Sequence, residues 1–126
     1  MPRSGRIAVT AVFMAAILGL SVVPSEPQPG DSVFIFLVAA TPTLLQKTMH
    51  VCFYGTLTAL WVWTLRGLPE PTARLTAAFL IAASYGALME GLQLFIPGRF
   101  ATLYDVMLNS LGAASGLLIA RFAWMR

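Results

Sequence analysis

Four long apolar stretches divide the chain, and polar or proline-containing segments separate them. The stretches cover about residues 7–23, 49–65, 75–96 and 106–124. Glu90 interrupts the third stretch and Arg121 the fourth. Because a helix needs roughly 17–25 mostly apolar residues to cross the hydrocarbon core of a bilayer, this pattern predicts four membrane-spanning helices.

A fifth apolar stretch, residues 33–40, is too short to cross a bilayer and lies between Asp31 and Pro42. We expect it to form a re-entrant or interfacial segment packed against the bundle, with a short strand as the alternative. The predicted fold class is therefore an all-α integral membrane protein. It is a four-transmembrane-helix bundle with this short segment after the first helix, and residues 1–126 form a single membrane domain.

The composition points to the same class of protein. Hydrophobic residues make up 58% of the 126 residues and charged residues only 10%, whereas a soluble domain carries roughly 25% charge. This composition excludes a soluble enzyme and a disordered tail. Cys52 is the single cysteine, so an intrachain disulfide is excluded as well. The basic residues are scattered rather than clustered, so we expect membrane lipids and no nucleic acid as partners.

The distribution of basic residues predicts the orientation. One side of the predicted bundle collects Arg3, Arg6, Arg66, Arg74, Arg121 and Arg126, and the other side collects Lys47 and Arg99. Because cytoplasmic loops of membrane proteins are enriched in Lys and Arg, both termini are predicted to be cytoplasmic. The first apolar stretch, preceded by arginines, also fits a cleavable signal peptide. Cleavage there would leave the orientation of the other three spans unchanged.

Polar side chains inside the spans recur at helical spacing. The second span carries them at i, i+3 and i+7, the third at i and i+3, and the fourth at i and i+4, so each set lies on one helix face. They are Lys47, His50 and Tyr54, then Glu90 and Gln93, then Asp105 and Asn109, with Gly112 and Gly116 continuing the last face. Together with Arg99, all the polar ones fall in the outer half of the bundle. The pattern predicts an outward-facing polar pocket contributed by these three helices.

Some of these residues also have structural interpretations. Glu90 is predicted to lie roughly 9 Å below the outer boundary, where a carboxylate must be paired or protonated. Lys47, His50 and Arg99 are the available partners. Thr102 and Asp105 have the spacing of a capping box. Gly112 and Gly116 form a GxxxG motif, which favours close helix packing either within the chain or in a homodimer.

These residues occur in the order and spacing of two family motifs. Residues 47–54 resemble K-x-x-H-x-x-x-Y, and residues 90–116 resemble a longer motif that runs from Glu90 through Pro97, Arg99, Asp105 and Asn109 to Gly116. Both motifs are typical of the VanZ-like family of small bacterial membrane proteins, although Gln46 stands where the family often has aspartate. The resemblance implies a four-helix protein of the bacterial inner membrane. The family's namesake is associated with resistance to teicoplanin, a lipid-tailed glycopeptide, and no established reaction explains it.

Three functions fit these residues. The first is binding or modulation of an anionic or lipid-linked envelope ligand, such as a lipoglycopeptide, by Lys47, Tyr54, Gln93, Arg99, Asp105 and Asn109. The second is an enzyme, a transferase or hydrolase of lipid substrates, with His50 and Glu90 as the catalytic acid–base pair. The third is a structural protein whose polar residues join helices. No cofactor and no metal ion is expected.

Overall fold

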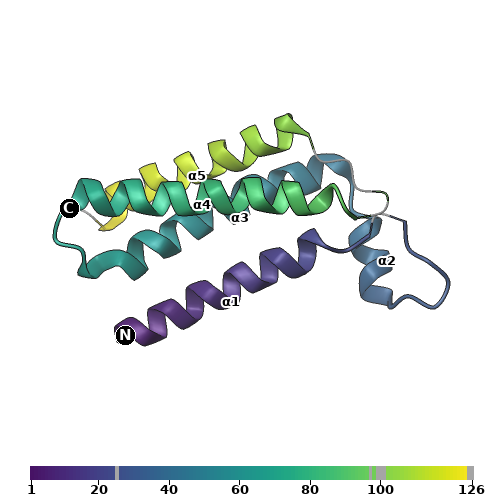
Figure 1. Cartoon of the computed structure of the whole chain (residues 1–126), viewed down its shortest axis with the longest axis horizontal. Coiled ribbons are helices and arrows are strands. Elements are labelled where there is room, and N and C mark those ends of the chain that lie inside the picture. Colours follow the sequence, from purple (N-terminus) through teal and green to yellow (C-terminus); the bar gives the residue numbers. More distant parts are fainter. Residues whose placement is uncertain (25, 97, 99–101, 125–126) are drawn as a thin grey trace.

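The computed structural model describes residues 1–24, 26–96, 98 and 102–124, and helices dominate this part of the chain. The elements in order are α1 (Arg3–Ser21), α2 (Val33–Ala39), α3 (Thr43–Thr64), the 3₁₀ turn η1 (Leu65–Gly67), α4 (Pro71–Gln93) and α5 (Leu103–Trp124) (Figure 1). Residues 33–39 are thus helical, so the strand alternative for this segment is wrong.

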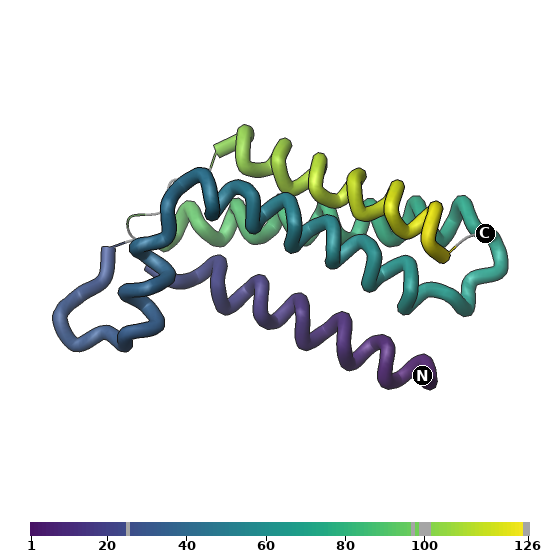
Figure 2. The backbone as a smooth tube through the Cα atoms, turned by 180° about the vertical axis from the view of Figure 1, so that it is seen from behind, coloured from purple at the N-terminus to yellow at the C-terminus, as the bar shows by residue number. Residues whose placement is uncertain are grey.

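The four long helices run up and down alternately. Both marked ends of the chain lie at one end of the bundle, and α2 lies at the other end, where α4 ends and α5 begins (Figures 1 and 2). This arrangement gathers five arginines at the end with the termini: Arg3, Arg6, Arg66, Arg74 and Arg121. Lys47, near the start of α3, lies toward the other end, so the described basic residues are separated as the sequence predicts. Arg99 and Arg126 lie outside the described residues. The location of the five arginines in the cytoplasm stays a prediction.

Three helices of the described chain are long and apolar enough to cross a membrane, namely α1, α4 and α5 with 19, 23 and 22 residues. The fourth long helix, α3, also has 22 residues, but it is not among these candidates. Its first two turns carry Gln46, Lys47 and His50, which lower its hydropathy. The crossing of α3 therefore stays a prediction, as does the interfacial or re-entrant placement of α2.

The bounds of α4 follow from local chemistry. Glu70 caps the helix by accepting hydrogen bonds from the backbone N–H groups of Thr72 (3.1 Å) and Ala73 (2.5 Å), and these bonds lower the pKa of its carboxyl group. Pro71 occupies the first turn, where its missing N–H costs nothing. The helix ends at Gln93 rather than at residue 96, because the chain tightens into i→i+3 hydrogen bonds over residues 94–96.

The closest interhelical packing is between α3 and α5, which run parallel. Gly112 lies against the backbone of Val51, and Gly116 lies against the backbone of Gly55. A Cβ atom on either residue of α5 would overlap these backbone atoms, so only glycine permits this approach. The GxxxG motif thus packs within the chain in this fold. The homodimer alternative stays a prediction.

Helix α1 is the most peripheral of the four long helices. Only Thr10 and Ile17 of its described residues are buried. Thr10 hydrogen-bonds to Thr64 of α3 (2.8 Å between hydroxyl oxygens), and the hydroxyl of Tyr85 on α4 donates to the carbonyl of Met14 (2.6 Å). These few polar contacts fix α1 against the tighter α3–α4–α5 core.

Candidate functional site

Three polar side chains from three helices meet in the half of the bundle nearer α2. Asn109 of α5 lies between His50 of α3 and Glu90 of α4. Its Oδ1 is 3.1 Å from His50 Nδ1, and its Nδ2 is 3.4 Å from Glu90 Oε1. Asn109 is fully buried and Glu90 is 4% exposed. The structure therefore brings together three residues that the sequence predicted to share a site.

The hydrogen bonds of Asn109 indicate which nitrogen of His50 carries a proton. The Nδ2 group of Asn109 faces Glu90 Oε1 and the carbonyl oxygen of Gly86 (3.5 Å), and both of these are acceptors. Oδ1 therefore faces His50, and Nδ1 of His50 must donate to it. Nδ1 is also 3.8 Å from Glu90 Oε1, so the carboxylate would stabilise a protonated imidazole.

Close packing holds this group of side chains in place. A Cβ atom on Gly86 would lie 3.0 Å from the Cβ of Asn109 and 3.1 Å from Cε1 of Tyr54. Tyr54, one turn after His50 on α3, is 2% exposed, and its ring centroid is 6.5 Å from that of His50. Gly86 thus gives Asn109 and Tyr54 the room to pack together against α4.

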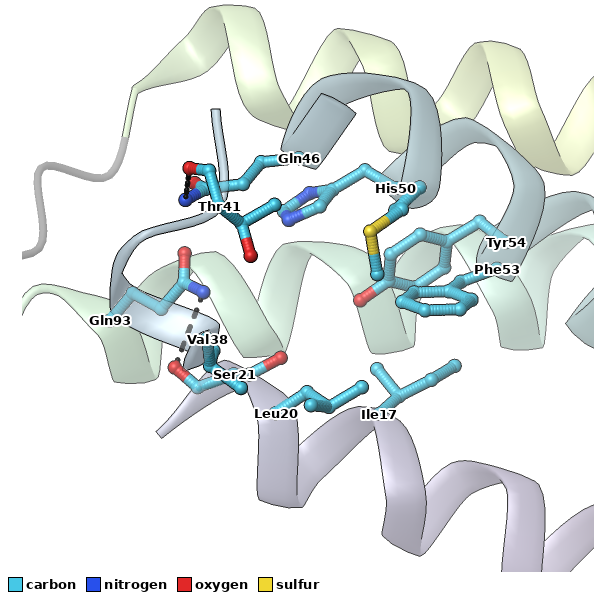
Figure 3. Close-up of a pocket in the computed structure, with 11 residues that line it drawn as sticks. Ile17, Leu20, Ser21, Val38, Thr41, Gln46, His50, Phe53, Tyr54 and Gln93 are labelled. Atoms are coloured by element: carbon cyan, nitrogen blue, oxygen red, sulfur yellow. Dashed lines mark hydrogen bonds between the residues drawn. The ribbon is translucent and has the colours of Figure 1, made fainter. Parts of the chain in front are cut away.

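A pocket opens on the side of His50 that faces α1. Its volume is about 90 Å³, enough for several water molecules. It is bounded by α1, the last turn of α2, the α2–α3 connection, α3 and α4 (Figure 3). The lining residues are Ile17, Leu20, Ser21, Val38, Thr41, Gln46, Met49, His50, Phe53, Tyr54 and Gln93.

The pocket has a different wall from the one the motifs predict. His50, Tyr54 and Gln93 line it as expected, and Gln93 Nε2 donates to the carbonyl of Ser21 on α1 (3.3 Å). Helix α5 contributes no lining residue in the described chain, because Asn109 is covered by His50 and Glu90. The predicted wall of α5 is replaced by α1, the last turn of α2 and the α2–α3 connection.

The predicted charged residues have other partners. The Lys47 ammonium lies 4.5 Å from the ring centroid of Tyr104, a cation–π contact. Asp105 accepts a hydrogen bond from the Thr102 hydroxyl (3.0 Å), and its N–H donates to the same hydroxyl (3.3 Å), as in the predicted cap of α5. Neither residue lines the pocket. Arg99 lies outside the described residues.

Sequence reasoning missed the residues of α1, of the last turn of α2 and of the α2–α3 connection. Ile17, Leu20 and Ser21 lie within one turn of α1, but apolar residues facing a pocket look the same in sequence as residues facing lipid. Gln46 could have been found, because it directly precedes the first motif. Its side chain donates to the carbonyl of Thr41 (2.9 Å) and shapes the edge of the pocket.

The chemistry available in the pocket is that of hydrogen bonding beside an apolar wall. His50, Gln93 and Tyr54 offer polar atoms, and Ile17, Leu20 and Phe53 offer apolar surface. In the part of the chain that the structure describes, His, Cys, Asp and Glu side chains do not gather in groups of three or more that could hold a metal ion.

Comparison with known proteins gives one match. The family model VanZ/LLP1 matches residues 9–124, which include every element from α2 to α5 and most of α1. This match confirms the resemblance found in the two motifs. No curated protein and no solved structure matches the chain.

Proposed function

Because the chain belongs to the VanZ/LLP1 family, we propose that it binds a lipid-linked ligand of the bacterial cell envelope in the pocket beside His50. The family match and the three apolar helices make it a VanZ-like membrane protein. The identity of the ligand, its binding in the pocket and an effect on glycopeptide susceptibility are parts of the proposal.

The proposed placement has α3 as a fourth span in the bacterial inner membrane, with the termini in the cytoplasm. Helix α3 matches its neighbours in length and packs between them. Helix α2 then lies in the outer interface, where its exposed apolar side chains would contact lipid. These are Val33, Phe34, Phe36 and Leu37. The pocket thereby opens toward the outer leaflet.

The observation that carries the proposal is the division of the pocket into a polar and an apolar wall. An amphipathic ligand would place its polar group against His50 and Gln93 and its chain against Leu20 and Phe53. Lys47, one turn before His50 on α3, would add a positive charge that attracts an anionic group. Both a lipid-linked wall precursor and a lipid-tailed glycopeptide have this chemistry.

Filling the pocket tests the proposal. In Leu20→Trp the larger side chain should occupy the space between α1 and α3, whereas Leu18→Trp adds the same bulk to an exposed position of α1. We expect lipid-linked molecules that co-purify with the wild type to be lost from Leu20→Trp and retained by Leu18→Trp. Mass spectrometry of the purified proteins measures this, and equal lipid content in both variants would contradict the proposal.

The contacts of His50 favour catalysis as a second candidate function. With its Nδ1 proton held by Asn109, a neutral His50 has Nε2 as its proton acceptor, and Glu90 at 3.8 Å would stabilise the imidazolium that forms. This pair could remove a proton from a hydroxyl group in a transferase or hydrolase reaction on a lipid substrate.

Substitution of His50 separates these candidates. If the protein is an enzyme, His50→Gln should abolish turnover of extracted envelope lipids while the lipid still co-purifies. If it only binds, no product forms with either protein, and His50→Gln changes the bound lipid or the teicoplanin susceptibility. If the polar residues serve packing alone, His50→Gln and Glu90→Gln lower the amount of folded protein and change neither property otherwise.

A further inference from the structure

A second cavity lies between α4 and α5, at the end of the bundle where the termini are. Its volume is about 460 Å³, within the range of roughly 300–1,000 Å³ that is usual for small-molecule sites. Its walls include Thr72, Leu75, Thr76, Phe79, Leu117 and Arg121. None of these residues belongs to the His50 pocket, so this α4–α5 groove requires its own explanation.

The polarity of the groove changes along its length. On α4 the lining residues Thr72, Thr76 and Phe79 lie on one face, with the two threonines nearest the end of the bundle. On α5, Arg121 lies toward the same end, and Leu117 lies one turn, about 6 Å, deeper. Pro71 and Leu75 also line the groove near the end of the bundle. The polar and cationic groups of the groove thus all lie near that end, and its deeper part, at Phe79 and Leu117, is apolar.

The charge of this end favours an anion. In the described chain it holds five arginines and a single acidic residue, Glu70, whose carboxylate already accepts two backbone hydrogen bonds at the start of α4. The Arg121 side chain is exposed and makes no ion pair or hydrogen bond with another described residue. Its guanidinium can therefore pair with a phosphate without losing a partner among the described residues.

We propose that the α4–α5 groove binds an anionic phospholipid from the leaflet at the end of the bundle that holds the termini. Arg121 pairs with the lipid phosphate, and the Thr76 hydroxyl donates a hydrogen bond to it. The upper part of an acyl chain lies along Phe79 and Leu117. A zwitterionic headgroup is disfavoured because it brings an ammonium group into surroundings that are already cationic.

Native mass spectrometry of the full-length protein in a neutral detergent tests this site, with phosphatidylglycerol or phosphatidylcholine added as the probe. The wild type should bind phosphatidylglycerol more tightly than phosphatidylcholine. Arg121→Gln should weaken phosphatidylglycerol binding about fivefold, which corresponds to about 1 kcal/mol for one basic residue. Arg3→Gln is the matched control, because it removes the same charge from the same end of the bundle, on α1 and away from the groove (Figures 1 and 2).

A second variant blocks the groove without changing its charge. Thr76 is exposed, so Thr76→Trp should fill the groove, leave the fold intact and weaken binding of phosphatidylglycerol. Equal losses in Arg121→Gln and Arg3→Gln would show attraction by the whole charged end and would overturn the proposal. Wild-type affinity in Thr76→Trp, or equal affinity of the wild type for both lipids, would overturn it as well.

Discussion

Replacing Gly116 by alanine should separate α3 from α5. The added Cβ would overlap the backbone of Gly55, and no side-chain rotation can relieve a contact with backbone atoms. Overpacking of this kind costs typically about 1–3 kcal/mol, and a rigid backbone contact belongs at the upper end. Alanine gains about 1 kcal/mol of helix propensity over glycine, which offsets part of this cost. We expect a net loss of about 2 kcal/mol in the free energy of unfolding.

Gly91→Ala is the matched control for this prediction. Gly91 also lies within a long helix, but apart from its own stretch of α4 no described atom lies within 4 Å of the position its Cβ would take. This variant should be neutral or more stable than the wild type by up to about 1 kcal/mol. Thermal unfolding of the detergent-solubilised proteins, followed by circular dichroism, compares the two variants.

The result for Gly116→Ala also tests where the GxxxG face is used. If the GxxxG face packs against α3 of the same chain, the substitution lowers the melting temperature at every protein concentration. If the face instead joined two copies of the chain, the wild type would be a dimer and the variant a monomer. The melting temperature of the monomer would then be unchanged. A melting temperature equal to that of Gly91→Ala, with no change of oligomeric state, would refute the reasoning from close backbone contact.

Three further predictions concern single positions. Gly86→Ala should push Asn109 away from His50, because its Cβ would lie 3.0 Å from that of Asn109, and ¹⁵N NMR of the imidazole should show a changed tautomer balance. Thr64→Val should loosen α1 by removing the bond to Thr10, at a cost of about 0.6–1.7 kcal/mol, and proteolysis within α1 should become faster. The carboxylate of Glu70 caps α4 and has a lowered pKa, so its contribution to stability is present above the ordinary Glu pKa of about 4.3 and is lost as the pH falls through the folded-state pKa. The melting temperatures of the wild type and Glu70→Ala should therefore differ at neutral pH and converge in acid.

The meeting of His50, Glu90 and Asn109 was predictable from the spacing of polar residues and from their depth along each span. Each residue interrupts an apolar helix face, and polar groups inside a membrane bundle turn toward one another because lipid offers no partners. Their helices run alternately up and down, so the position of each residue along its helix also set its depth. Close packing at the GxxxG motif was also predictable from the spacing of Gly112 and Gly116. The sequence did not indicate whether the packing partner is α3 or a second copy of the chain.

The extent of the pocket was not predictable, because the deciding residues carry no distinctive pattern. Leu20 of α1 lines the pocket, whereas Leu18 two residues earlier is exposed, and sequence treats both as lipid-facing apolar residues. Lys47 shares a helix face with His50, yet its long side chain reaches the ring of Tyr104 instead. Position on a helix face therefore predicted the buried group of His50, Glu90 and Asn109 better than it predicted the residues around the pocket.

The packing of α3 on α5 and the geometry of the candidate site depend on the same contact. Along the two parallel helices, His50 meets Asn109, Val51 meets Gly112, and Gly55 meets Gly116. The glycine contacts fix the distance between the two backbones, and that distance fixes how far Asn109 lies from His50. A variant that spreads the glycine contacts should thus weaken the His50–Asn109 hydrogen bond even though Gly116 is seven residues away. Because stability and site geometry change together in such a variant, loss of function at a glycine does not identify a ligand contact.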